Sequence, residues 1–240
     1  MLIFLSLISG LFWNIFVLFL IIFIHELGHV LASLYYKWDI SKIEFSVTGG
    51  FITYDTLIDM PFYQELIISI SGFMAQWLMY ALIFLMYKNG YIDIKFFILM
   101  KNYHYLIFFF NLLPMYPLDG YKIMYVLLNV FFSFKFSIKM GGLISLFMII
   151  PFMLFFYNGL NIGILFLVFF ILKKIILYLK DIPYLFNTFL LQKYFYKKRY
   201  KKYNYINSIN INKLKRQKNN YLYNKKRYIK DTDVLRKMFD

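Results

Sequence analysis

Long runs of apolar residues set the strongest limit on what this 240-residue chain can fold into. Most residues from Leu2 to Tyr36 are apolar, and comparable blocks follow later in the chain. A helix needs about 20 consecutive apolar residues to cross a bilayer. The chain is 61% hydrophobic, whereas soluble domains contain about 45–50% apolar residues. The sequence therefore predicts an all-α polytopic membrane protein.

Helix-breaking residues and polar loops divide the apolar sequence into about five to six transmembrane helices. A break at Ser9-Gly10 is expected to separate a short interfacial piece from the first span. The predicted helices cover residues 11–36, 66–87, 96–111, 119–134, 141–157 and 160–178.

The polar loop after the first helix contains a predicted β-hairpin. Residues 43–47 and 51–54 are rich in strand-forming residues and flank Thr48-Gly49-Gly50. Two such segments around a Gly-Gly pair are typical of a hairpin with a tight turn. We expect a small hairpin directly after the first helix.

Most of the formal charge of +15 lies near the C-terminus. From Asp181 to Asp240 there are sixteen Lys and Arg residues and four acidic residues. A basic segment that follows the last span is expected to stay in the cytoplasm and to contact anionic lipid. Because no nucleic-acid-binding motif accompanies the charge, no nucleic acid is expected as a partner.

These observations predict two parts of the chain. Residues 1–180 form a membrane domain, and residues 181–240 form a basic cytoplasmic tail that is partly helical or disordered. With about five crossings, the end of the first helix then faces the cytoplasm as well. The chain contains no cysteine, which excludes a disulfide framework and a thiolate metal site.

The first predicted helix contains, toward its end, His25-Glu26-Leu27-Gly28-His29. Residues four apart share a helix face, so the two imidazoles can bind one metal ion. Glu26 can then reach a water molecule at that metal as general base, the H-E-x-x-H arrangement of zinc hydrolases. Gly28 allows another backbone to approach closely.

The H-E-x-x-H pattern also occurs by chance in unrelated proteins. Here, however, its three ionisable residues lie in apolar sequence. Each ionisable residue costs ~2.5–3.5 kcal/mol to insert at the centre of a membrane helix. Metal binding by two neutral imidazoles and a carboxylate removes most of that cost, so a metal site is the better interpretation.

A catalytic zinc site needs a third protein ligand and an open position. Asp119 is the only acidic residue between Asp93 and Asp181, and it follows a stretch with two prolines that breaks a predicted helix. We predict Asp119 as the third ligand. His104 is the alternative third ligand; otherwise it is expected to be an interfacial or hydrogen-bonded histidine.

Two motifs together resemble the site-2 protease family of intramembrane zinc metalloproteases. Residues 25–29 read H-E-L-G-H, and residues 111–120 read N-L-L-P-M-Y-P-L-D-G. The second motif is similar to that family's N-x-x-P-x-x-P-L-D-G element on a later transmembrane helix. The pair, in this order and in apolar sequence, is far more specific than either motif alone.

The resemblance implies a role for each matching residue. One zinc ion would be held by His25, His29 and Asp119, and Glu26 would activate water. Asn111 matches a family asparagine that helps to hold the substrate or the developing oxyanion. Capping the break in the helix is the alternative role for Asn111.

Further segments resemble one branch of the family, the stage IV sporulation protein FB group. They are Thr48 to Gly50, Ser71 to Met74 and Phe189 to Phe195, and the resemblance covers roughly residues 15–200. That group often carries a C-terminal nucleotide-sensing domain, for which residues 181–240 are too few and too polar.

Three residues depart from the family pattern. Tyr121 replaces a glycine, Phe73 replaces a proline, and Gln76 lies near where many relatives have asparagine. These departures bear on local geometry and substrate fit rather than on the metal ligands.

The resemblance implies a zinc metalloendopeptidase in the bacterial cell membrane, with its active site toward the cytoplasm. Its expected substrate is the membrane-associated pro-sequence of a sporulation sigma-factor precursor, and inhibitory membrane proteins are expected partners. The alternative is a broader site-2 protease that cuts an anti-sigma factor or a signal-peptide remnant.

Two other classes of membrane protein were weighed against a protease. A non-catalytic scaffold would not need the carboxylate of Glu26. A metal transporter usually has ligands on several helices, whereas this chain contains three histidines in all.

Overall fold

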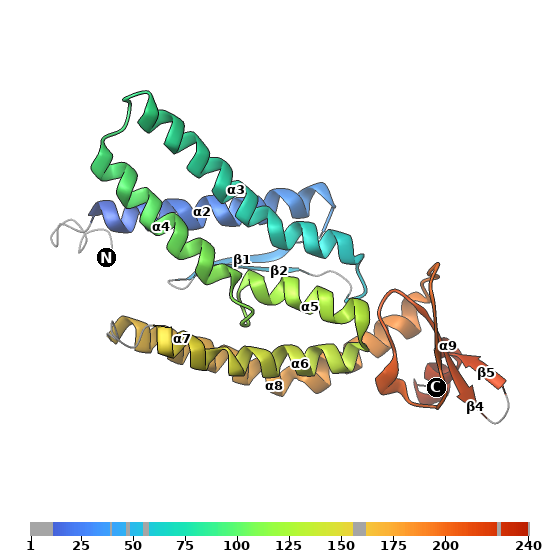
Figure 1. Ribbon diagram of the computed structural model, residues 1–240. Coiled ribbons are helices and arrows are strands. Elements are labelled where there is room, and N and C mark those ends of the chain that lie inside the picture. The colour runs from blue at the N-terminus through green and yellow to red at the C-terminus, as the bar shows by residue number, and fades with distance from the viewer. Residues whose placement is uncertain are drawn as a thin grey trace. The chain divides into compact units, whose positions relative to one another are not determined.

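The computed structural model describes residues 12–38, 40–46, 49–54, 58–155, 162–224 and 227–239, which form mainly helices (Figure 1). The chain forms two compact units. One consists of Met1–Thr56 and Ile67–Leu113, and the other of Leu57–Leu66 and Pro114–Asp240. The break predicted at Ser9-Gly10 lies outside the described residues.

The first unit contains α2 (Phe12–Tyr35), α4 (Ile94–Leu112) and the greater part of α3 (Phe62–Lys88). Asp93 caps α4, because its Oδ2 accepts a hydrogen bond from the Lys95 backbone N–H at 3.1 Å. Burial of apolar side chains in a shared core stabilises the three helices against one another. The buried members of this core are Val17, Ile21, Met79, Ile83, Phe97, Met100 and Ile107.

The predicted hairpin is present, formed by β1 (Ile40–Ser46) and β2 (Gly49–Tyr54) in antiparallel pairing. The prediction placed Gly49 and Gly50 in the turn, and this detail is wrong. Gly49 pairs with Ser46 and Gly50 with Phe45, so both glycines belong to β2.

The second unit contains four further long or medium helices. They are α5 (Asp119–Phe131), α6 (Phe134–Phe147), α7 (Ile149–Phe155) and α8 (Ile162–Tyr196). Helix α6 packs against α5 and α8. It begins at Phe134 rather than at residue 141, and α8 continues past residue 178 to Tyr196 without a break at residue 180.

Residues 197–239, the C-terminal module, contain a small sheet. Its elements are β3 (Tyr203–Ile206), the short 3-10 helix η2 (Ile211–Lys213), β4 (Asn219–Asn224), β5 (Arg227–Lys230) and α9 (Asp231–Phe239). Strand β4 lies in the middle, parallel to β3 and antiparallel to β5. The sequence analysis did not anticipate these strands, which have four to six residues each and contain several asparagines, a residue that is depleted in strands.

The inner face of the module packs on the helices of the second unit. Leu214, Leu222 and Leu235 are fully buried in one cluster with Phe134 and Phe189. The backbone N–H of Phe134 donates to the Leu214 carbonyl at 3.0 Å. The module is therefore fixed to the start of α6.

A buried arginine joins the module to the segment that leads into α3. The Arg216 guanidinium pairs with Glu65, lies 3.9 Å from Asp59, and stacks over the Phe62 ring at 5.1 Å. Burial disfavours the charged guanidinium, but its attraction to the Glu65 carboxylate raises the pKa of Arg216 above its ordinary value. Tyr200 donates to Asp59 at 2.6 Å, and burial together with this bond raises the pKa of Tyr200.

Three described helical stretches are long and apolar enough to cross a membrane: Phe12–Tyr35, Phe62–Lys88 and Phe134–Leu154. Helix α4, with 19 residues, has about the length that a crossing requires, and α8, with 35 residues, exceeds it, but both carry more polar residues. The chain is a mostly helical, polytopic membrane protein with a hairpin after the first long helix, which confirms the predicted fold class.

Candidate metal centre

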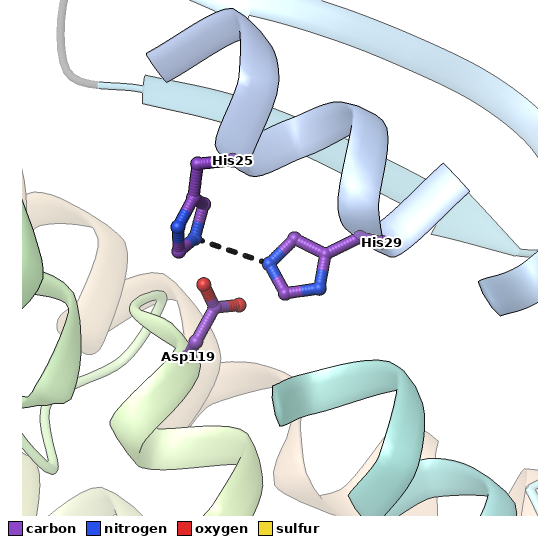
Figure 2. Close-up of side chains that lie close together, drawn as sticks. All are labelled: His25, His29 and Asp119. Atoms are coloured by element: carbon purple, nitrogen blue, oxygen red, sulfur yellow. Dashed lines mark hydrogen bonds between the residues drawn. The ribbon is translucent and has the colours of Figure 1, made fainter. Parts of the chain in front are cut away.

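Two histidines on successive turns of α2 face each other within the first unit. The Nε2 atoms of His25 and His29 are 3.2 Å apart, and both side chains are almost completely buried (Figure 2). This follows from the four-residue spacing, which places both rings on one helix face.

The other nitrogen of each ring is held by an oxygen atom from α3. His29 Nδ1 lies 2.6 Å from the Ile68 carbonyl oxygen, and His25 Nδ1 lies 3.1 Å from Gln76 Oε1. A carbonyl or amide oxygen only accepts, so each Nδ1 must donate. In the neutral rings the Nε2 atoms then carry lone pairs, which is the form that binds metal ions.

The two Nε2 atoms lie 3.2 Å apart. A cation bound beside both nitrogens would offset the repulsion between their lone pairs. A pair of neutral imidazoles with their outer nitrogens fixed by oxygen acceptors is a common arrangement in zinc sites. The donor set on α2 therefore fits a divalent metal.

Glycines leave room beside these nitrogens. A Cβ on Gly72 would lie 2.3 Å from His29 Nε2 and 2.8 Å from His25 Nε2. A Cβ on Gly28 would lie 2.5 Å from the Ser71 carbonyl oxygen. The backbones of α2 and α3 thus approach closely, as small residues permit in membrane helices, and Gly72 places no side chain against the two Nε2 atoms.

Glu26 lies on α2 directly after His25 and is buried, with 8% of its surface exposed. A carboxylate adjacent in sequence to the first histidine is the general base of H-E-x-x-H hydrolases. Its burial in an apolar helix agrees with a role at a metal centre rather than with a solvated surface charge.

Asp119 is the first residue of α5, in the second unit, and it is buried. The predicted break in the helix is present, since α4 ends at Leu112 and α5 begins at Asp119. The start of a helix favours a carboxylate. Lys122 also donates to Asp119 Oδ1 at 2.7 Å.

Among the described residues, His25 and His29 of the first unit and Asp119 of the second unit are all buried, and each offers a ligand atom of a kind that can hold a metal ion. These are the three residues that the sequence predicted as ligands. Two imidazoles and one carboxylate form the ligand set of several catalytic zinc sites, which keep a fourth position for water or substrate.

The remaining predicted residues occupy α4. Asn111 lies in its last turn and is half-buried. His104 is fully buried, and both its Nδ1 and its backbone oxygen lie within hydrogen-bond distance of Gln76. His104 is thus hydrogen-bonded, as one interpretation of the sequence expected.

Sequence reasoning missed the support that α3 gives to the imidazoles. Gln76 was noted only as a departure from a family pattern, and Gly72 and the Ile68 carbonyl were not connected with the metal. A polar residue inside an apolar helix is the signal that could have indicated Gln76.

The chain was compared with known proteins. No protein-family model matches it. Stage IV sporulation protein FB of Bacillus subtilis (strain 168) is 31% identical over 126 residues, which are 52% of this chain and 43% of that protein. The match thus spans less than half of the relative's length.

A similar fold is found in the site-2 protease from Methanocaldococcus jannaschii. The two structures agree with a TM-score of 0.58 at 22% sequence identity, over 74% of this chain and 83% of that one. The resemblance indicated by the two motifs is therefore confirmed: this chain shares the fold of a site-2 protease and, over about half its length, is similar in sequence to stage IV sporulation protein FB.

Proposed function

We propose that this chain is an intramembrane zinc metalloprotease that hydrolyses a peptide bond in a membrane-associated protein. The observation that carries the proposal is the pair of buried imidazoles on α2, with Nε2 atoms 3.2 Å apart, next in sequence to the buried Glu26. No soluble surface role explains three ionisable groups in five residues of an apolar helix.

One zinc ion is assigned to His25, His29 and Asp119. Support comes from the burial of all three side chains, from the ligand atoms that they offer, and from the fold shared with a site-2 protease. When bound, zinc supplies a Lewis acid that polarises the scissile carbonyl and makes water more acidic.

Glu26 moves the proton in this reaction. Its carboxylate takes a proton from the attacking water while a bond forms between the water oxygen and the carbonyl carbon. It then gives the proton to the amide nitrogen as the carbon–nitrogen bond breaks. Asn111 is assigned to hold the carbonyl oxygen through its side-chain amide as negative charge develops there.

The substrate must offer an accessible amide. Amides in a membrane helix are hydrogen-bonded within the helix, so the cleaved segment has to unwind or bind in an extended form. The hairpin of β1 and β2 is a natural partner, because a strand edge can pair with an extended peptide.

The proposed substrate is the membrane-associated pro-sequence of a sporulation sigma-factor precursor, with inhibitory membrane proteins as partners. Support comes from the similarity to a Bacillus protein named for stage IV of sporulation. The alternative is a general site-2 protease that acts on an anti-sigma factor or a signal-peptide remnant. In either case the active site is assigned to the cytoplasmic side, because the positive charge follows the last helix.

Anionic lipid is the proposed partner of the C-terminal module. Residues 197–239 contain fifteen Lys and Arg residues and two acidic residues. Hydrogen bonds fix the module to the start of the candidate span Phe134–Leu154, which keeps its charges near a membrane surface. Four tyrosines of its sheet, which suit an interface, are exposed: Tyr203, Tyr205, Tyr223 and Tyr228.

Co-expression with candidate sigma-factor precursors tests the protease. We expect wild type to shorten the precursor and Glu26→Gln to leave it intact, with equal zinc content in both purified proteins. Asp233→Asn is the matched control, because it also replaces a carboxylate by an amide, at an exposed position of α9. We expect this variant to process the precursor normally. Processing by Glu26→Gln at the wild-type rate would exclude Glu26 as general base.

A further inference from the structure

Gln76 connects two histidines of the first unit through its side-chain amide. Its Oε1 lies 3.1 Å from His25 Nδ1, and its Nε2 lies 2.8 Å from the His104 backbone oxygen and 3.3 Å from His104 Nδ1. All three side chains are fully or almost fully buried. A buried amide of this kind costs free energy unless its groups are paired, so these contacts are strongly held.

The contacts with His104 decide which way the amide points. A backbone oxygen only accepts, so the NH2 group of Gln76 must face His104. The amide oxygen then faces His25, where only a protonated Nδ1 can donate to it. His25 is thereby held in the tautomer whose Nε2 carries the lone pair.

Aromatic packing fixes this part of α4. The His104 ring stacks on Tyr80 with centroids 4.4 Å apart and an interplanar angle of 11°, and it meets the edge of Trp77 at 5.0 Å. On the other side, the edge of Phe73 contacts the His25 ring at 5.3 Å. The partners of Gln76 therefore have little freedom to turn away.

We propose that Gln76, anchored by His104, is a positioning residue that fixes the tautomer and ring orientation of His25 for metal binding. The inference rests on the proposed zinc site and adds a residue to it. His29 is held in the same way by the Ile68 carbonyl, which no side-chain substitution removes. Gln76 is therefore the position where this support can be tested by substitution.

Zinc affinity is the first measurement, made by competition with a chromogenic chelator on the purified full-length chain. Gln76→Leu keeps the approximate volume but removes the acceptor, and loss of such an outer partner weakens metal binding about 10–100-fold. His104→Phe keeps the backbone oxygen that orients Gln76, so we expect its zinc affinity to stay within about threefold of wild type.

The tautomer itself is the second measurement, and it does not depend on enzyme activity. The chain contains three histidines, so ¹⁵N-histidine labelling gives few ring signals in an NMR spectrum. In zinc-free wild type we expect the His25 proton on Nδ1. In Gln76→Leu we expect a mixture of both tautomers.

The outcomes separate this inference from the proposed function. If wild type binds no zinc, the metalloprotease proposal fails. If wild type binds zinc and Gln76→Leu binds it equally well, or if His25 carries its proton on Nε2 in the wild type, the positioning role is overturned. Loss of zinc in His104→Phe would also overturn it, because that result would make His104 a ligand. If Gln76→Leu does not fold, the tautomer of His25 in the wild type still tests the positioning role of Gln76.

Discussion

The imidazoles of His25 and His29 present their Nε2 atoms to each other at 3.2 Å, while an oxygen of α3 holds the opposite nitrogen of each ring. Helix α3 therefore prepares the metal site, although it supplies none of the three proposed ligands.

Substitution of Asp119 should weaken metal retention. Asp119→Asn keeps the size of the side chain but replaces an anionic oxygen by a neutral one, which binds zinc less strongly. We expect less than one zinc ion per chain after dialysis, measured by elemental analysis, with Asp233→Asn as the control. Unchanged stoichiometry would assign the third ligand elsewhere, and His104 would be tested next.

A methyl group at residue 72 should block the site. A Cβ there would lie 2.3 Å from His29 Nε2, so Gly72→Ala is expected to abolish zinc binding. Gly90→Ala is the control, because a Cβ at residue 90 would have no heavy atom within 4 Å. Gly90 has a φ of +77°, a left-handed backbone conformation that is unfavourable for alanine. That variant should lose about 1–2 kcal/mol of stability and keep its zinc. Full zinc binding by Gly72→Ala would contradict the close approach of α3.

The first helix and the hairpin could be predicted because the signals are local. An apolar block that follows Ser9-Gly10 and ends at a polar loop predicts a first span at residues 11–36, and α2 covers Phe12–Tyr35. The sheet of the C-terminal module was missed because its strands are short and polar, and their pairing joins β3 to β4 across an intervening loop. Contacts of that kind leave little trace in local sequence.

The metal site also has one part that could be predicted from the sequence and one part that could not. The spacing of His25 and His29 is a property of one helix, so it could be predicted. The partner of His25 is Gln76, 51 residues away, and the sequence shows only that a polar residue interrupts an apolar helix. Which groups contact Gln76 depends on how α3 and α4 pack.

Removal of the buried arginine should destabilise the second unit. Arg216→Ala leaves Glu65 and Asp59 without the charge that faces them. Loss of one partner from a buried ion pair costs about 3–5 kcal/mol. We expect a clearly lower midpoint of thermal unfolding in detergent, whereas Lys213→Ala, at an exposed residue of η2, should change it little. Equal midpoints would show that the C-terminal module contributes little to the stability of this unit.

Anionic lipid should stabilise the chain through its basic module. In nanodiscs we expect a higher unfolding midpoint with phosphatidylglycerol than with phosphatidylcholine alone, and high salt should remove the gain because it screens surface charge. The double variant Lys201→Glu with Lys230→Glu should show a smaller gain. A gain that is independent of salt and of these charges would argue against headgroup binding.

X-ray absorption at the zinc edge of the purified wild-type chain tests the central claim most directly. The account predicts one zinc ion per chain, with two imidazole nitrogens and carboxylate oxygen at about 2.0–2.2 Å. An ion surrounded by oxygen atoms alone, or a chain that retains no zinc, would contradict it.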